Sequence, residues 1–137
     1  MRKPIFGQTD AQHNLSDDRR RDVAKFLSEQ DLSRPLVERF ALAARGVMGA
    51  DHVGVTIGFP GQGMRGGSSF GSEVEGMRAD EAQFDLGEGP SVDALASFVP
   101  IVVGDILSAD SLRRWPLAAP ALASIGLKGV FSFPLRV

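Results

Sequence analysis

The order of helical and strand-like segments constrains the fold of this chain more than any other feature of its sequence. Apolar residues recur at helical spacing over residues 17–30 and again over residues 33–49, and they alternate at period two over residues 51–59. Further strands are predicted over residues 68–74, 99–103 and 129–137, and further helices over residues 77–84, 90–96 and 117–125. Helices and strands interleaved in this way predict an α+β domain.

The start of the chain is predicted to lie outside this domain. Residues 1–16 are polar, contain Pro4 and Gly7 and show neither period, which is typical of a flexible tail. The other residues, 17–137, are predicted to form a single domain, because a chain of 137 residues of which 43% are hydrophobic has room for only one core.

The composition excludes several classes of function. The chain has 0 Cys, which rules out disulfides, cysteine-ligated zinc, iron–sulfur clusters and thiol catalysis. Its net charge of -2 gives no basic surface of the kind that binds DNA or RNA, so we expect no direct contact with nucleic acid. The sequence contains neither the roughly 20 apolar residues of a membrane-spanning helix nor a signal-peptide core, so we expect a cytoplasmic protein without membrane contact.

Three patterns that could indicate cofactor binding, metal binding or catalysis are better explained without these functions. Residues 61–66 match the G-x-G-x-x-G spelling of dinucleotide-binding folds, but residues 67–71 after them are poor helix formers. We therefore interpret this segment as a connection between two strands and expect no cofactor. The two histidines, His13 and His52, lack the spacing of a metal site, and Ser91 lacks the G-x-S-x-G setting of a serine nucleophile. We expect neither a metal ion nor catalysis.

Two residues in predicted loops have several explanations. Trp115 is the only Trp of the chain, and it either covers the core with its indole N–H bonded to a carbonyl or contacts a ligand. Glu88 lies between Gly87 and Gly89, where neither helix nor strand packing explains an acid. It is expected either to cap the helix that follows or to hold the loop.

Three strings in the second half of the chain carry a family resemblance. They are Gln-Phe-Asp-Leu-Gly-Glu-Gly-Pro-Ser-Val-Asp-Ala over residues 83–94, Asp105 followed by Arg-Trp-Pro over residues 114–116, and residues 126–135, which end in Ser-Phe-Pro-Leu. In this order they resemble the GAF domains of actinobacteria, which often precede an RNA-binding ANTAR module. The resemblance implies a PAS-like antiparallel sheet flanked by helices, and a sensory or regulatory role in signal transduction.

The same resemblance indicates where a ligand would bind. The motif loop consists of Gly87, Glu88, Gly89, Pro90, Ser91 and Asp93. A ligand pocket between the sheet and the helices is predicted to be bordered by Phe84, Leu86, Val92, Trp115, Phe131 and Phe133.

The chain departs from the family pattern in ways that matter for function. Ser91 stands where this subfamily commonly has Cys, so thiol-dependent sensing does not carry over, and the cysteine-dependent free methionine sulfoxide reductases of GAF type are excluded. The cyclic-nucleotide signature and the ANTAR module are absent. The last strand and the closing helix of the family are also missing, so the strands at residues 53–59 and 129–137 are expected to pair directly or to be completed by a second copy.

Three functions therefore remain open. The leading expectation is a non-enzymatic, GAF-like sensory domain that binds a small molecule. The alternative is a ligand-free protein-interaction or dimerisation module that self-associates through strand edges or helices. An enzyme that binds a nucleotide through the glycine-rich residues 61–66 comes third.

Overall fold

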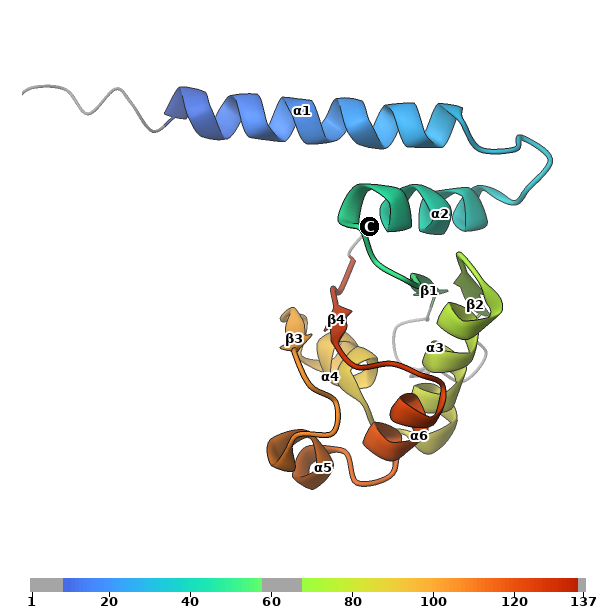
Figure 1. The fold of residues 1–137 in the computed structure, drawn as a ribbon, viewed down its shortest axis with the longest axis vertical. Coiled ribbons are helices and arrows are strands. Elements are labelled where there is room, and N and C mark those ends of the chain that lie inside the picture. The colour runs from blue at the N-terminus through green and yellow to red at the C-terminus, as the bar shows by residue number, and fades with distance from the viewer. Residues whose placement is uncertain (1–8, 58–67, 136–137) are drawn as a thin grey trace, which may run out of the picture.

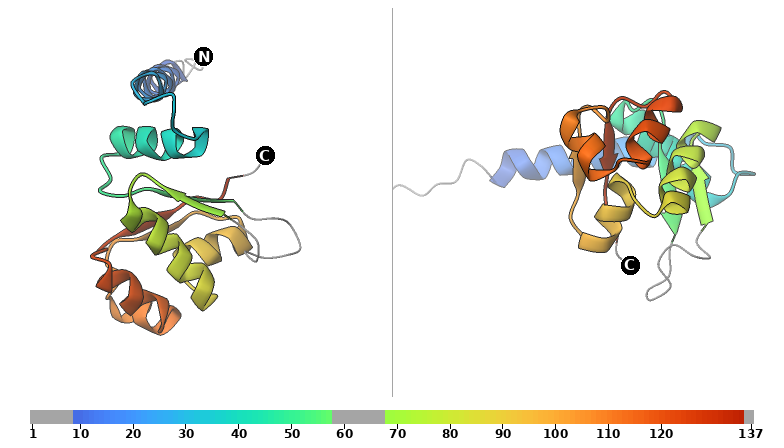
Figure 2. Two further views of the ribbon diagram at one scale, coloured as in Figure 1. Left: turned by 90° about the vertical axis from the view of Figure 1, so that its right-hand side faces the viewer. Right: turned by 90° about the horizontal axis from the view of Figure 1, so that it is seen from below.

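The computed structural model describes residues 9–57 and 68–135, and in these ranges the chain is an α+β fold built in layers (Figures 1 and 2). Helix α1 (Thr9–Ser28) lies on helix α2 (Leu36–Met48), and α2 in turn lies on the strand layer. The strands are β1 (Gly54–Ile57), β2 (Ser68–Gly71), β3 (Ile101–Val103) and β4 (Val130–Ser132). The opposite side of this layer is covered by α3 (Val74–Leu86), α4 (Pro90–Ser97), α5 (Ala109–Arg114) and α6 (Ala118–Ser124).

The four described strands form two separate antiparallel sheets. β1 pairs with β2, with Val55 opposite Phe70, and β3 pairs with β4, with Val102 opposite Phe131. The prediction that the first and the final strand pair directly is therefore wrong within one chain, because β1 and β4 belong to different sheets. Completion by a second copy stays a prediction.

Helix α3 approaches β1 more closely than ordinary side chains would allow. A Cβ atom on Gly76 of α3 would stand 2.7 Å from the carbonyl oxygen of Val53, and a Cβ atom on Gly54 would stand 2.7 Å from the carbonyl oxygen of Gly76. Both separations are too short for carbon and oxygen, so the approach depends on glycine at both positions. Since side chains alternate along a strand, Gly54 and Thr56 face α3, and Val55 faces α2.

The main core lies between the β3–β4 sheet and helices α3, α5 and α6. Its most buried large side chains are Ile106 and Leu122, and the indole of Trp115 is only 3% exposed. The complete cluster consists of Ala79, Val103, Ile106, Trp115, Ala118, Ala119 and Leu122. Burying these apolar side chains is the main driving force that holds α3, α5 and α6 to the β3–β4 sheet.

Two helices begin earlier than predicted. α1 begins at Thr9, eight residues before the helix that the sequence predicts from residue 17, and the flexibility of the tail stays a prediction. A helical period in the sequence reveals only those parts of a helix that bury an apolar face. A polar stretch can extend an existing helix without such a face, because each added residue contributes one backbone hydrogen bond. α3 begins at Val74, which the sequence had assigned to a strand. The end of α2 at Gly49, in the left-handed region with φ 64°, agrees with the prediction.

Helix α5 occupies a segment that was predicted to be a loop. It has only 6 residues, and the hydroxyl oxygen of Ser108 caps it by accepting a hydrogen bond from the backbone N–H of Ser111 at 3.2 Å. A helix of this length shows too few apolar positions to reveal a period.

The strands are shorter than predicted. β1 covers part of the predicted 51–59, and β4 ends before Pro134, which has no N–H to offer a strand ladder. The glycine-rich residues 61–66 lie outside the described residues.

Candidate functional site

Asp80 of α3 is the centre of a hydrogen-bonded group between the two sheets. Its carboxylate accepts hydrogen bonds from the Thr56 hydroxyl at 2.9 Å and from the Ser91 hydroxyl at 3.2 Å, and the residue is only 9% exposed. Burial raises the pKa of this carboxyl above its ordinary value, while the two hydrogen bonds act in the opposite direction.

The hydrogen-bonded group around Asp80 extends to β2 on one side and to β4 on the other. Ser69 Oγ lies 3.2 Å from Thr56 Oγ1, and Ser132 Oγ lies 3.1 Å from Ser91 Oγ. We call the five residues Ser69, Thr56, Asp80, Ser91 and Ser132 the hydroxyl–carboxylate chain. It crosses from β2 through β1, α3 and α4 to β4, and so it links two sheets that are not paired through their backbones.

The motif loop is fixed by a buried glutamine. The Gln83 amide nitrogen donates to the carbonyl oxygen of Ala79 at 3.1 Å, and its amide oxygen accepts from the backbone N–H of Ser91 at 2.7 Å. Gly87 ends α3 with φ 70°, and Gly89 has φ 137° with its Cα against the Gln83 side chain. Both glycines adopt conformations that other residues avoid, so the Gly-Glu-Gly string defines one loop geometry.

Glu88 ties this loop to a distant helix. Its Oε1 accepts hydrogen bonds from the backbone N–H groups of Leu117 at 2.6 Å and Ala118 at 2.8 Å, at the start of α6. The prediction that Glu88 caps the helix that follows it is therefore wrong, since the cap residue of α4 is Gly89 and Glu88 caps α6 instead. The alternative, that it holds the loop, agrees with these bonds.

Asp93 connects the motif loop to the Arg-Trp-Pro string. Its Oδ2 accepts a hydrogen bond from the indole N–H of Trp115 at 3.0 Å and pairs with the Arg114 guanidinium at 2.9 Å. The guanidinium also lies over the Trp115 ring, 4.7 Å from its centroid. Trp115 is thus buried in the core, as one of its two predicted roles required, and its indole N–H bonds to a carboxylate instead of the predicted carbonyl.

Of the six residues assigned to the predicted ligand pocket, only Trp115 lines the hollow found beside the motif loop. Trp115 lines a shallow hollow of about 190 Å³ between β3 and α5. Phe131 and Phe133 flank Ser132, which is buried toward α4, so both rings point to the opposite, exposed face of β4.

The other three predicted pocket residues lie on α3 and α4. Phe84 and Val92 are half-buried on α3 and α4, and Leu86 is exposed at the end of α3. None of the three lines the hollow beside Trp115.

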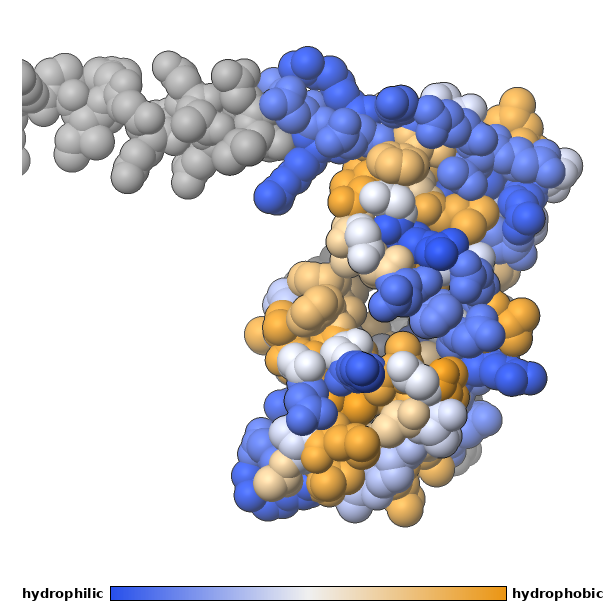
Figure 3. All heavy atoms as spheres, viewed as in Figure 1, coloured by the Kyte–Doolittle hydropathy of each residue, from blue (hydrophilic) through white to orange (hydrophobic). Residues whose placement is uncertain are grey.

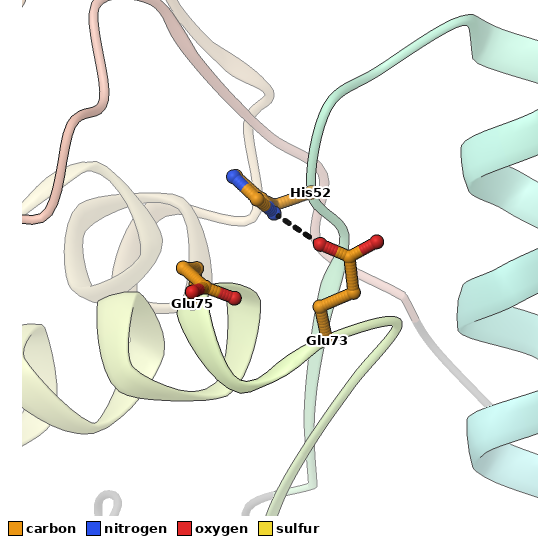
Figure 4. Close-up of side chains that lie close together, drawn as sticks. All are labelled: His52, Glu73 and Glu75. Atoms are coloured by element: carbon orange, nitrogen blue, oxygen red, sulfur yellow. Dashed lines mark ion pairs between the residues drawn. The ribbon is translucent and has the colours of Figure 1, made fainter.

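One set of potential metal ligands was missed in the sequence. His52, Glu73 and Glu75 each offer a ligand atom, and these atoms lie within 4.8 Å of one another (Figure 4). The spacing of His52 along the chain gives no sign of a metal site, but the β1–β2 pairing brings this residue beside the start of α3. Helix periodicity gives no signal for such a contact.

Within the described ranges, no helix is long and apolar enough to cross a membrane. Comparison with known proteins gave no match to any family model, to any curated protein or to any solved structure.

Proposed function

We propose that this chain is a non-enzymatic, GAF-like regulatory domain in signal transduction and that it acts by associating with a second copy of itself. The observation that carries the proposal is an apolar sheet face that the described part of the chain leaves exposed. A non-enzymatic role is supported by the motif loop, since Glu88 Oε1, Ser91 Oγ and Asp93 Oδ2 each bond to groups inside the domain.

The exposed face belongs to the β3–β4 sheet. We call Val102, Phe131, Phe133 and Leu135 the open face; they are 67%, 58%, 53% and 79% exposed. Val102 and Phe131 lie directly opposite each other on the two strands. Helix α2 packs on β1 and β2, and apolar residues remain visible over β3 and β4 (Figure 3). Adjacent exposed apolar residues of this kind mark interaction surfaces.

The chemistry of the open face favours a second copy as its partner. All four side chains are apolar, so they are complementary to another apolar surface, and an identical copy supplies one through two-fold symmetry. The net charge of -2 adds little repulsion between two copies.

The size of the open face sets the expected affinity. The two Phe side chains can each bury about 150–250 Å² in full, and together with Val102 and Leu135 the open face offers on the order of 450 Å² per copy at these exposures. Two copies together then bury about 900 Å², below the roughly 1,200 Å² of standard specific interfaces. We therefore expect a reversible dimer with micromolar affinity rather than a permanent one.

Sedimentation equilibrium over a wide concentration range tests this function. Phe131→Lys places a charge in the centre of the open face and should weaken the dimer at least about tenfold, equivalent to about 1.4 kcal/mol. Leu32→Lys makes the same kind of change at a residue that is 77% exposed between α1 and α2, and it should leave the affinity unchanged. A monomer at every concentration, or equal weakening by both variants, would overturn the proposal.

The surroundings of Trp115 favour a second candidate function, the binding of a small molecule. Arg114 is half-exposed beside the hollow, and a ligand that drew its guanidinium away from Asp93 would act directly on the motif loop. A hollow of about 190 Å³ suits only a few heavy atoms, since typical ligand pockets hold roughly 300–1,000 Å³. We therefore rank the binding of a small molecule in this hollow second.

The fluorescence of Trp115 is the natural readout for this second function. A saturable change with one compound of a small-metabolite panel, lost in Arg114→Ala and kept in Arg113→Ala, would support it. No saturable change, or the same response in both variants, would refute it.

A further inference from the structure

Three side chains of the types that can ligate a metal meet near the starts of β1 and α3. His52 lies just before β1, Glu73 is the cap residue of α3, and Glu75 is in the first turn of that helix. The backbone holds the first two side by side: Val53 N–H donates to Ser72 Oγ at 2.9 Å, and Ser72 N–H donates to the Val53 carbonyl at 2.8 Å. The three side chains therefore converge from two segments that are fixed to each other (Figure 4).

The separation of two potential ligand atoms fits a shared metal ion. His52 Nδ1 and Glu73 Oε2 lie in ion-pair contact, 3.2 Å apart (Figure 4), yet Nδ1 is buried and makes no hydrogen bond of good geometry with the described residues. Two ligands bound to one ion at about 2.0–2.2 Å, with tetrahedral to octahedral angles, lie about 2.9–3.5 Å apart. The pair thus has the spacing of metal ligands without forming a well-directed hydrogen bond.

Arg45 of α2 holds Glu73 in position for such a role. Its guanidinium lies 2.6 Å from Glu73 Oε1, which leaves Oε2 directed toward His52. Ligating carboxylates are commonly held by a hydrogen bond to their other oxygen, and this support orients them before the metal binds.

We propose that His52, Glu73 and Glu75 bind one divalent transition-metal ion of the Zn²⁺ class. An imidazole nitrogen favours Zn²⁺ or Co²⁺ over Mg²⁺ and Ca²⁺, which prefer oxygen ligands alone. Glu75 Oε reaches the ion by a small rotation of its side chain, because it already lies within 4.8 Å of the other two ligand atoms. Three protein ligands leave a further position for water.

The bound ion would join the start of β1 to the start of α3, and through Arg45 it would connect both to α2. This metal site does not depend on the open face of the β3–β4 sheet, so the outcome of one experiment leaves the other unaffected.

Calorimetric titration of the metal-free full chain with Zn²⁺ tests the proposal. We expect one saturable site per chain with micromolar affinity, and an affinity at least about tenfold lower in His52→Gln and in Glu75→Gln. His13→Gln removes the only other histidine and should leave the affinity unchanged. Glu81→Gln is the matched control for Glu75→Gln, since it changes an exposed acid on the same helix.

Co²⁺ provides a spectroscopic check on the ligand set. Its visible absorption should show nitrogen and oxygen ligands in the wild type and should lose the imidazole contribution in His52→Gln, and circular dichroism shows whether each variant is folded. If His52→Gln does not fold, Glu75→Gln alone decides the test. The proposal is overturned if no saturable binding occurs below about 1 mM Zn²⁺, if His13→Gln weakens binding as much as His52→Gln, or if Glu75→Gln binds as tightly as Glu81→Gln.

Discussion

Replacing Glu88 with Ala should destabilise the domain through a helix that lies far along the chain. Glu88 Oε1 accepts the backbone N–H groups of Leu117 and Ala118, and the first of these is 29 residues away. The first N–H groups of a helix have no partner inside it, and the helix dipole favours a negative charge at this end. Because α6 carries Leu122 into the core, loss of the cap loosens core packing as well.

The hydrogen-bond distances and the burial of Glu88 set the size of the expected loss of stability. A hydrogen bond to a charged group contributes about 1.5–3 kcal/mol, and removal of a helix cap costs about 0.5–2 kcal/mol. Glu88 is half-buried and both bonds share one oxygen, so water recovers part of the loss. We expect Glu88→Ala to cost about 2 kcal/mol and Glu88→Gln about 1 kcal/mol, because the amide keeps an acceptor and loses the charge. For a domain of this size the Ala variant should melt about 6–12 °C lower.

Urea unfolding followed by Trp115 fluorescence measures this difference, because Trp115 is the only Trp and is buried. Glu81→Ala, which removes an exposed acid from α3, is the control and should change the free energy of unfolding by less than about 0.5 kcal/mol. The reasoning is refuted if Glu88→Ala unfolds at the same urea concentration as the control, or if the Gln variant is destabilised as much as the Ala variant.

Three further substitutions test other contacts. Because burial raises the pKa of Asp80, the folded protein holds this proton more tightly than the unfolded chain, so wild-type stability falls as the pH rises from the ordinary aspartate value to the raised one. Asp80→Asn should remove this fall, and urea unfolding across that pH range would contradict the idea if both proteins gave parallel curves. Gly76→Ala places a methyl group 2.7 Å from a backbone oxygen and should cost about 1–3 kcal/mol by circular dichroism, whereas Gly104→Ala, with open space around it, should cost less. Trp115→Phe removes the indole donor and should cost about 1–2 kcal/mol in the same assay; an unchanged melting temperature would contradict this role.

The parts of the fold that bury an apolar face could be predicted from the sequence. α2, α4 and α6 were expected close to their observed positions, because apolar residues recur along them and Gly or Pro marks one end. α5 was missed because a serine cap, rather than an apolar period, defines it. The α+β class followed from the order of elements, and this order does not depend on exact boundaries.

The candidate site was harder to predict because its contacts join distant segments. Glu88 stood out as an acid that local packing could not explain, but nothing near it in the sequence indicates that its partner is α6. Asp80 is polar and therefore adds nothing to the apolar periods of the sequence. Small and polar residues at helical spacing mark it instead, since Gly76, Ala79, Asp80 and Gln83 form the buried face of α3.

That polar helix face also links the two sheets, which share no backbone ladder among the described residues. Strands that pair through their backbones satisfy N–H and C=O groups directly, whereas β1 and β4 are linked through Thr56, Asp80, Ser91 and Ser132. Such a link is sensitive to single changes, because removing one member leaves a buried polar group without a partner, and this costs more than an ordinary hydrogen bond contributes. We therefore expect single substitutions at Thr56, Asp80, Ser91 or Ser132 to destabilise the junction between the sheets more than the loss of one exposed hydrogen bond would.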